Sequence, residues 1–315
     1  MTILITESSN YSSLAVRLYQ KIGPVWFDHP PEGNDHLVRV LVVRLSVILD
    51  AVCLSRYPNL QAIVTPTTGL THINLDFCKE HGIEVFSLGR CKELIEKITS
   101  TSELTLGLII ALLRGIPRAN SSVVNKREWK RDAFRSRQLS HLTLGVVGLG
   151  RIGGHVALYG HALGMHVQAS DPHQPDERFK KLNVEKLTMA ELLVSSDILT
   201  IHANLTQNNH KLIGEEEIRL LPSHALVINT ARGQLLDEGA LADALRQGRV
   251  AGVAVDVLSE EHMPILIAES PLVRAARDGL NIIITPHIGG CTSDAMHLTE
   301  ENMAEVYVNY FNELS

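Results

Sequence analysis

The feature that most restricts the fold of this chain is a set of three glycines with the spacing Gly148-x-Gly150-x-x-Gly153. It follows an apolar, β-rich run at 144–149 and opens a segment, 152–163, with apolar residues at helical spacing. In such a strand–turn–helix unit the first glycine permits the tight turn, the second lets the backbone approach a phosphate chain, and the third allows close packing. The helix N-terminus adds free N–H groups and a positive dipole. The pattern predicts a dinucleotide-binding unit.

An acidic residue, Asp171, follows the next β-rich run, at 166–170. A carboxylate at this position accepts hydrogen bonds from the adenine ribose hydroxyls and repels a 2′-phosphate. The residues that follow, Pro172, His173 and Gln174, include no arginine that could receive such a phosphate. The sequence therefore predicts NAD as the cofactor in preference to NADP.

Short β-rich runs alternate with amphipathic stretches along the chain, which predicts parallel sheets with helices on both faces. In the first hundred residues the predicted strands are 2–6, 25–27, 40–43, 62–65 and 84–88. Six further strands, which suit a dinucleotide-binding sheet, are predicted at 144–149, 166–170, 198–202, 226–230, 252–257 and 282–285. A last helix, 299–311, places Met303, Val306, Tyr307 and Tyr310 on one face. We expect that helix to pack on the first domain.

A helix from Thr101 to Leu113 carries apolar residues on nearly every face. Ser100 and Glu103 fit a capping box at its start. Because a helix of this kind cannot face water, we expect it to lie between domains or against a second subunit.

Composition limits the classes of partner. A length of 315 residues suggests two domains, and 29 basic against 35 acidic residues give a net charge of −6. This balance argues against a general grip on nucleic acid or on an anionic membrane. The basic segment 125–137, with Trp129 and Phe134, is interpreted as a solvent-exposed connection.

The sequence also indicates the cellular location. The longest apolar stretch, 104–113, is too short to span a membrane, and no signal peptide precedes the first strand. The four cysteines form no C-x-x-C pair, and no H-E-x-x-H motif occurs. We therefore expect a cytoplasmic protein with reduced thiols and no metal site.

Several motifs, in order, resemble those of the D-isomer-specific 2-hydroxyacid dehydrogenase family. They are VGLGRIG (147–153), INTARGQLLDE (228–238), AVDVLSEE (254–261) and TPHIGG (285–290), with further likeness in TGLTHINLD (68–76), SELTLGLIIALLRG (102–115) and TIHANLT (200–206). The resemblance implies an α/β fold of two domains. A Rossmann NAD-binding domain, 101–288, is expected to be inserted in a flavodoxin-like substrate domain, 1–100 and 289–315.

The family resemblance also implies an activity. Family members transfer a hydride between NAD(H) and C2 of a 2-hydroxy or 2-oxo acid, and the glyoxylate/hydroxypyruvate, pyruvate and 3-phosphoglycerate classes all remain open. A homodimer joined through the helix at 101–113 is expected, because the family joins its cofactor domains there. The alternative is an NAD-sensing interaction protein similar to the C-terminal binding protein corepressors, which share this fold.

Three residues in these motifs suit the reduction of a 2-oxo acid. Arg232 offers a forked cation for carboxylate and carbonyl oxygens. His287 can deliver a proton, since imidazole exchanges protons near neutral pH. By its spacing from Arg232, Glu261 matches the family's catalytic glutamate, which would orient the imidazole, and Glu260 is the alternative if the turn differs by one residue. The family brings these three groups to the nicotinamide in the cleft between its domains.

The resemblance further implies ligand-binding positions. Those for the cofactor are Gly148, Gly150, Arg151, Ile152, Gly153, Asp171, His202, Thr230, Ala231, Arg232, Asp256, His287 and Gly289. The substrate carboxylate is expected on backbone N–H groups of Thr68, Gly69 and Leu70. Arg44 matches a position that is basic in the phosphoglycerate branch, where it would suit a phosphorylated or dicarboxylic substrate, but an ordinary ion pair is equally open.

Three positions depart from the family pattern. His262 stands where proline usually follows the catalytic glutamate, Leu258 where an aromatic residue is usual, and Asn204 where proline is common. The first two leave open both the shape of the loop that carries Glu261 and the choice of substrate.

Overall fold

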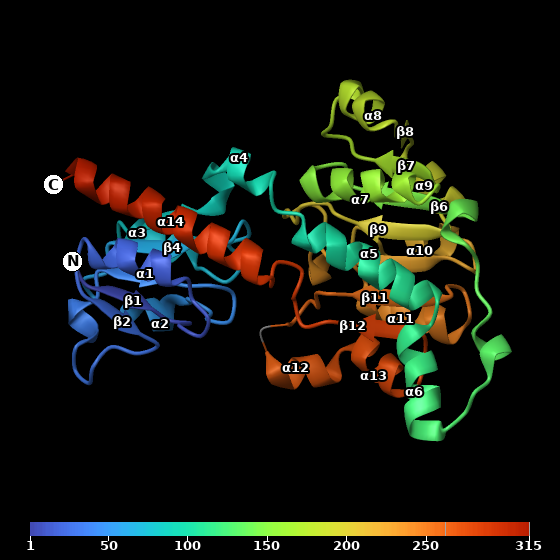
Figure 1. Ribbon diagram of the computed structural model, residues 1–315, viewed down its shortest axis with the longest axis horizontal. Helices are drawn as coiled ribbons and strands as arrows, with labels where there is room; N and C mark the ends of the chain where they lie inside the picture. The colour runs from blue at the N-terminus through green and yellow to red at the C-terminus, as the bar shows by residue number, and fades with distance from the viewer. Residues whose placement is uncertain (262, 315) are drawn as a thin grey trace. The chain divides into compact units, whose positions relative to one another are not determined.

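The structure, a computed structural model, describes residues 1–261 and 263–314. His262, one of the departures from the family pattern, lies outside the described residues. The chain divides into two compact units, one formed by Met1–Ile98 with Cys291–Ser315 and the other by Thr99–Gly290 (Figure 1). Each unit is built on one parallel sheet.

The sheet of the first unit has five strands in the order β2-β1-β3-β4-β5. They are β1 (Ile3–Ile5), β2 (Val25–Phe27), β3 (Val40–Val42), β4 (Ala62–Thr65) and β5 (Glu84–Ser87). The three central strands are buried along their whole length, as is usual in a parallel sheet that is covered on both faces. This strand order is that of flavodoxin-like sheets, and the predicted fold of this unit is confirmed.

Helices cover this sheet. They are α1 (Ser13–Gln20), α2 (Ala51–Ser55), α3 (Leu75–Glu80), α4 (Lys92–Ile95) and α14 (Ser293–Leu314), with short 3-10 turns at η1 (Asp35–Leu37) and η2 (Leu88–Arg90). The C-terminal helix α14 packs against α1, β4 and β5, and its Met303 and Tyr307 are buried in the core that these elements share. The predicted return of the last helix to the first unit is confirmed, although the helix begins at Ser293 instead of Thr299.

The sheet of the second unit has seven parallel strands in the order β12-β11-β10-β9-β6-β7-β8. They are β6 (Thr143–Val147), β7 (His166–Ser170), β8 (Glu185–Lys186), β9 (Ile198–Ile201), β10 (Leu226–Asn229), β11 (Gly252–Val255) and β12 (Ile282–Ile284). Strand order reverses at β6, which lies between β9 and β7. Ligands of open α/β sheets bind at such a reversal, beyond the carboxyl ends of the strands.

Nine helices of this unit lie in its described residues. They are α5 (Ser100–Leu113), α6 (Ile116–Lys126), α7 (Arg151–Ala162), α8 (Asp176–Leu182), α9 (Met189–Ser195), α10 (Glu215–Leu220), α11 (Glu238–Arg246), α12 (Pro264–Glu269) and α13 (Pro271–Arg277). Short 3-10 turns occur at η3 (Arg131–Phe134), η4 (Leu139–His141) and η5 (Gly233–Leu235). Helix α5 packs on α7, β10 and β11 of its own unit.

The start of α5 corrects one prediction. Thr99, not Ser100, is the N-cap residue, and its hydroxyl lies 2.5 Å from Oε1 of Glu103. Ser100 is already helical and buried. The capping-box prediction was wrong because Glu103 meets the side chain four positions before it, not three. Leu108, Ile109 and Leu112 lie in the core of the second unit, so this unit itself buries one face of the helix.

Within the described part of the chain, no individual helix has the length and apolar character needed to cross a membrane. One bent pair, Glu93–Leu113 with Ile116–Lys126, meets the length and composition test only when its two parts are joined across a bend of 57°.

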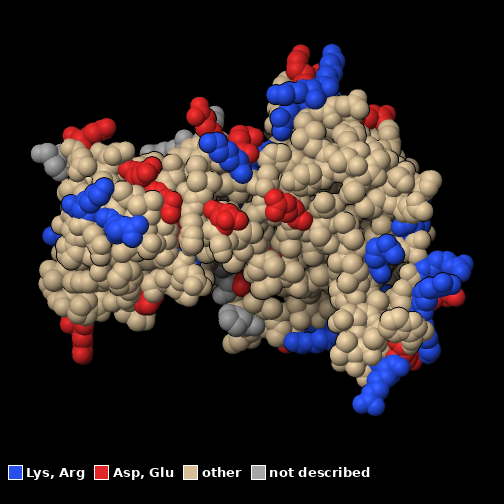
Figure 2. Space-filling view, in the orientation of Figure 1, with Lys and Arg blue, Asp and Glu red and all other residues tan. Residues whose placement is uncertain are grey.

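The segment 125–137 is largely solvent-exposed. Its charges partly pair with one another, as Lys130 does with Glu128 at 2.8 Å. On the face shown in Figure 2, basic and acidic side chains stand side by side near α6. This arrangement agrees with the interpretation of the segment as an exposed connection.

Candidate functional site

The predicted glycine turn leads from β6 into α7. Gly148 has a φ of +90°, which glycine adopts without strain, and a Cβ there would lie 2.8 Å from the backbone nitrogen of Ala203. A Cβ on Gly153 would lie 2.0 Å from the carbonyl oxygen of Gly148. At Gly150, by contrast, a Cβ would meet nothing within 4 Å. The fold therefore requires the outer two glycines, whereas Gly150 leaves the backbone open to a ligand.

Asp171 lies beside this turn. Its Oδ2 accepts the N–H of Leu149 at 2.7 Å, and its Oδ1 accepts the N–H of His173 at 2.9 Å. The carboxylate thus ties the loop after β7 to the turn after β6. Its position at the end of the neighbouring strand is the one from which a ribose is bound in dinucleotide folds.

The sequence analysis missed Arg178, on α8. Its Nε donates to the carbonyl oxygen of Leu149 at 3.3 Å, and its Nη2 donates to that of Gly150 at 3.0 Å. Gly154 makes room for it, because a Cβ there would lie 2.4 Å from Nη2 of Arg178. Nothing in the local sequence marks this arginine. Only the fold of α8 beside α7 brings it to the turn.

Two predicted cofactor positions follow β9 and β10. His202 is half-buried, its Nε2 lies 2.9 Å from Oγ1 of Thr200, and burial of the imidazole lowers its pKa to about 3. The imidazole is therefore neutral near pH 7. Its backbone N–H donates to the carbonyl of Val147, directly before the glycine turn, at 2.7 Å. At the end of β10, the hydroxyl of Thr230 lies 2.9 Å from that of Thr105 on α5.

Glu261 and His287 meet in the second unit. Nδ1 of His287 lies 2.7 Å from Oε1 of Glu261, and the two side chains are 25% and 18% exposed. The other carboxylate oxygen of Glu261 accepts the N–H of Leu258 at 3.3 Å. The pair fixes the orientation of the imidazole and leaves Nε2 as the ring atom for proton exchange. Among the described contacts it is Glu261, and not the alternative Glu260, that pairs with the ring.

A buried carboxylate holds the loop that carries His287. Oδ1 of Asp256 accepts the hydroxyl of Thr285 at 2.5 Å and the N–H of Ile288 at 2.9 Å, and Oδ2 accepts the N–H of Gly289 at 2.8 Å. Burial raises the pKa of Asp256, and these hydrogen bonds oppose the rise. His287 itself has a φ of +53°, in the left-handed region that few non-glycine residues adopt.

Arg232 lies in the turn after β10. Its Nη1 donates to the carbonyl of Ala231 at 2.6 Å. Burial lowers the pKa of Arg232, and the negative charge of Glu261 opposes that change, so the two groups interact electrostatically. The side chain of Asn229 braces the turn, accepting the N–H of Ala231 at 2.9 Å and donating to the carbonyl of Arg232 at 2.8 Å. The structure thus gathers Arg232, Glu261 and His287 in one region of the second unit.

The predicted substrate loop lies in the first unit, after β4. The hydroxyl of Thr67 donates to the carbonyl of Gly69 at 2.9 Å. Among the described residues, the backbone N–H groups of Thr68, Gly69 and Leu70 have no hydrogen-bond acceptor. Successive N–H groups of this kind suit an anionic ligand such as a carboxylate.

Arg44 forms a buried ion pair within the first unit. Nε and Nη2 donate to the same oxygen of Glu300 at 2.9 and 2.5 Å, and Nη1 donates to the carbonyl of Ser9 at 3.0 Å. The side chain of Glu300 is fully buried and that of Arg44 is 15% exposed. Of the two alternatives for Arg44, the structure favours the ion pair.

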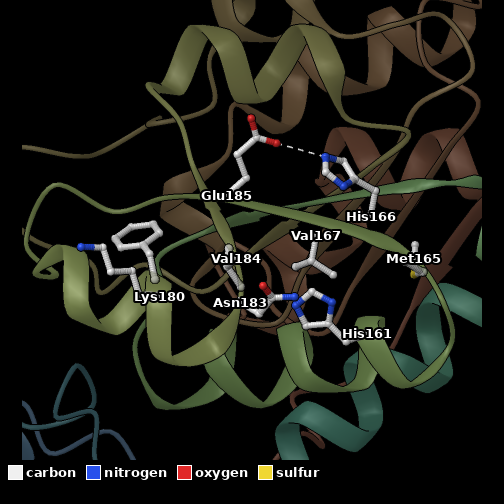
Figure 3. Close-up of a pocket in the computed structure, with 9 residues that line it drawn as sticks. His161, Met165, His166, Val167, Lys180, Asn183, Val184 and Glu185 are labelled. Carbon is white, nitrogen blue, oxygen red and sulfur yellow. Dashed lines mark hydrogen bonds and ion pairs between the residues drawn. The ribbon is translucent and has the colours of Figure 1, made fainter.

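A surface hollow of about 620 Å³ lies away from these groups (Figure 3). It is lined by the end of α7, by α8 and by the beginnings of β7 and β8. His166, the first residue of β7, lies 3.1 Å from Glu185 there, whereas Asp171 follows the other end of that strand. The hollow therefore lies at the opposite edge of the sheet from the glycine turn.

No group of three potential metal ligands occurs in the described residues.

Comparison with known proteins decides the family. The model of the "D-isomer specific 2-hydroxyacid dehydrogenase, NAD binding domain" matches residues 106–289. The chain belongs to this family. Its second unit is accordingly an NAD-binding domain, and NAD is the cofactor.

Relatives of this chain include the D-3-phosphoglycerate dehydrogenase of Bacillus subtilis, 36% identical over 264 residues that make up 84% of this chain and 48% of that protein. The D-3-phosphoglycerate dehydrogenase of Mycobacterium tuberculosis is 31% identical over 309 residues, 96% of this chain and 55% of that protein. The chain thus spans about half the length of the curated relatives that it matches.

Solved structures match nearly the whole chain. A D-lactate dehydrogenase from Aquifex aeolicus, complexed with NAD and lactic acid, is 28% identical with a TM-score of 0.84, covering 99% of this chain and 96% of that one. The TT0316 protein from Thermus thermophilus is 27% identical with a TM-score of 0.81, covering 98% and 97%. The α/β fold with two parallel sheets is therefore shared with this dehydrogenase family.

The residues at the glycine turn of this chain fit NAD. The space left free at Gly150 admits a pyrophosphate to the backbone, and α7 begins directly behind it. The carboxylate of Asp171 stands beside the turn, and the imidazole of His202, after β9, is uncharged near pH 7.

Proposed function

We propose that this dehydrogenase transfers a hydride between NAD(H) and C2 of a small 2-hydroxy or 2-oxo acid, with the D-isomer specificity of its family. The observation that carries the proposal is the 2.7 Å pair of His287 and Glu261, with Arg232 in electrostatic reach of the carboxylate. A proton donor, its orienting carboxylate and a cation for the substrate are the groups that such a reduction needs. When bound, the nicotinamide supplies or accepts the hydride.

Arg232, Glu261 and His287 have different roles in the proposed reaction. In the direction of reduction, Nε2 of protonated His287 gives its proton to the carbonyl oxygen as C2 gains the hydride, and the carbonyl becomes a hydroxyl. In oxidation the neutral ring takes the proton back. Arg232 pairs with the carboxylate and the reacting oxygen, where charge builds up. Glu261 acts through His287, by holding the ring in one orientation through the contact with Nδ1.

The cofactor positions follow from the sequence and from their places at the strand ends. Gly148, Gly150, Arg151, Ile152 and Gly153 would hold the pyrophosphate, and Asp171 the adenine ribose. The remaining positions would lie along the rest of the cofactor: His202, Thr230, Ala231, Arg232, Asp256, His287 and Gly289. The role of Asp256 is indirect, because its carboxylate is engaged in holding the loop of His287.

The substrate is a small 2-oxo or 2-hydroxy acid. Its carboxylate would bind the N–H groups of Thr68, Gly69 and Leu70 in the substrate domain, residues 1–100 and 289–315, while residues 101–288 bind NAD. Glyoxylate, hydroxypyruvate, pyruvate and 3-phosphohydroxypyruvate are the candidates. Because Glu300 neutralises the guanidinium of Arg44, we favour a substrate without a phosphate group.

A homodimer in the cytoplasm is the expected form of the enzyme. Exposed apolar side chains follow α5 along the chain, and they include Ile116, Val124 and Trp129, the last of them 87% exposed. Apolar surface of this kind is usual at subunit interfaces. The reduced thiols of the cysteines agree with a cytoplasmic location. Light scattering at micromolar concentration tests the dimer, and a monomer would contradict it.

A panel of 2-oxo acids, assayed for oxidation of NADH, tests the proposed reaction. We expect turnover with at least one candidate and loss of most of it in His287→Asn, which removes the proton donor. Arg232→Ala should in addition raise the KM for the oxo acid. Stoichiometric binding of NADH without turnover of any acid would overturn the proposal and favour the NAD-sensing alternative.

A further inference from the structure

The contact between Arg178 and the glycine turn goes beyond the proposed reaction. The guanidinium of Arg178 donates to two successive carbonyl oxygens, those of Leu149 and Gly150, at 3.3 and 3.0 Å. The carbonyl of Gly150 also accepts the N–H of Gly154, the first hydrogen bond of α7. Arg178, on α8, therefore holds the residues that connect β6 to α7 by hydrogen bonds to their carbonyl oxygens.

These hydrogen bonds from Arg178 determine where the N–H groups of the turn point. A peptide unit is planar and trans, so its C=O and N–H point in opposite directions. Arg178 holds the carbonyls of Leu149 and Gly150 toward itself. The N–H groups of the same two peptide units, which belong to Gly150 and Arg151, therefore point to the opposite side. A Cβ at Gly150 would meet nothing within 4 Å, so the turn itself leaves space beside it, and N–H groups at the start of a helix are where an anion binds.

The position of Arg178 depends on a second residue, Gly154. A Cβ at Gly154 would lie 2.4 Å from Nη2 and 3.4 Å from Cζ of Arg178. Nη2 is the far end of a flexible side chain, so a methyl group at Gly154 would displace the guanidinium at little cost to the fold. Gly154 thus provides the space in which Arg178 reaches the turn.

We propose that Arg178 is a positioning residue for the NAD pyrophosphate, which presets the N–H groups of the glycine turn by holding the carbonyls behind them. The guanidinium also adds a positive charge beside the phosphates. Removal of the arginine should weaken every ligand that carries the pyrophosphate and should leave a ligand without it nearly unchanged.

The first test measures equilibrium binding, independently of turnover. Arg178→Ala should raise the Kd of NADH and of ADP-ribose by about tenfold, which corresponds to about 1.4 kcal/mol. The Kd of adenosine should change less than twofold. Arg178→Lys, which keeps the charge but not the fork, should recover part of the loss. The matched control is Lys181→Ala, which removes one exposed positive charge from the same helix and should leave all three Kd values unchanged.

The second test uses the space at Gly154. In the wild-type background Gly154→Ala should weaken NADH binding about as much as Arg178→Ala does, because it displaces the guanidinium. In the Arg178→Ala background the same methyl group should have no further effect on the Kd. In that background Gly154→Ala should also raise the melting temperature of the protein without ligand, relative to Arg178→Ala alone, because alanine is a better helix residue than glycine.

Three outcomes would overturn the proposal. They are an unchanged Kd of ADP-ribose in Arg178→Ala, an equal loss for adenosine, and additive effects of Gly154→Ala and Arg178→Ala on the Kd of NADH. Because these are binding measurements, their failure would leave the proposed hydride transfer untouched.

Discussion

Asp256→Asn is the substitution that best tests how the structure holds His287. The carboxylate of Asp256 accepts three hydrogen bonds from the loop, from the hydroxyl of Thr285 and the N–H groups of Ile288 and Gly289. An asparagine oxygen can keep the first two. Its NH₂ group would then face the N–H of Gly289, donor against donor.

The magnitude follows from this exchange. Loss of a hydrogen bond to a charged group costs about 1.5–3 kcal/mol, and a buried N–H left without an acceptor costs about 1–3 kcal/mol. Part is offset, because burial raises the pKa of Asp256 and a neutral amide is cheaper to bury. We expect the free energy of unfolding to fall by about 2–3 kcal/mol. Because a misplacement of 1 Å can cost on the order of a hundredfold, kcat should fall by at least about tenfold.

Urea denaturation and steady-state oxidation of NADH measure the two effects. The matched control is Asp197→Asn. Asp197 also accepts a backbone N–H, that of Thr143 at 2.8 Å, but it precedes β9 at the far end of the sheet. Asp197→Asn should lose stability and keep kcat. An Asp256→Asn protein with unchanged stability and kcat would refute the reasoning, as would equal losses of kcat in the two variants.

The remaining predictions concern charge. Asp171 should make kcat/KM favour NADH over NADPH by at least about tenfold, and Asp171→Asn should narrow that ratio; equal wild-type efficiencies would contradict this role. Glu261→Gln should lower kcat without changing the Kd of NADH, because a neutral amide holds the imidazole of His287 less firmly than the carboxylate does at 2.7 Å, and an unchanged kcat would show that Glu261 does not act on the ring. Burial lowers the pKa of His202 to about 3, against about 6.5 when unfolded, so its stabilising contribution is complete above pH 6.5 and is lost as the pH falls toward 3. Between pH 7.5 and 5.0 the wild type should lose about 2 kcal/mol that His202→Gln retains, as measured by urea denaturation; an equal slope in His202→Gln, or a reduced slope in the exposed control His173→Gln, would refute it.

The sequence predicted the parts of the fold that apolar runs and glycines determine. The buried strands β1, β3 and β4 were located within one residue at each end, since a strand covered on both faces must be a continuous apolar run. Strand β8 was missed because its two residues, Glu185 and Lys186, are exposed and carry no apolar pattern. It exists because β7 offers it a backbone to pair with.

The site was predictable where a motif carries it and not where only tertiary structure does. The glycine turn and the residues of the pair formed by Glu261 and His287 could be named from local motifs. The choice of Glu261 over Glu260 could be made only from the three-dimensional structure, because a turn that differs by one residue exchanges the positions of the two side chains. Arg178 could not be found, because the partners of its guanidinium are backbone carbonyls, which every sequence has.

Three carboxylates of the second unit show how environment assigns different tasks to one functional group. Asp256 is 1% exposed, and its carboxylate oxygens accept hydrogen bonds from N–H groups of the loop that carries His287. Its substitution should therefore affect stability and turnover together. Glu261 is partly exposed and faces an imidazole, so its substitution should affect turnover with little effect on stability. Asp171 stands beside the glycine turn, so its substitution should affect the choice of cofactor. A general loosening of the fold would produce the same loss in all three variants. The structure instead predicts a different effect for each of the three substitutions. If one variant showed the effect expected of another, the environment that we assign to that carboxylate would be wrong.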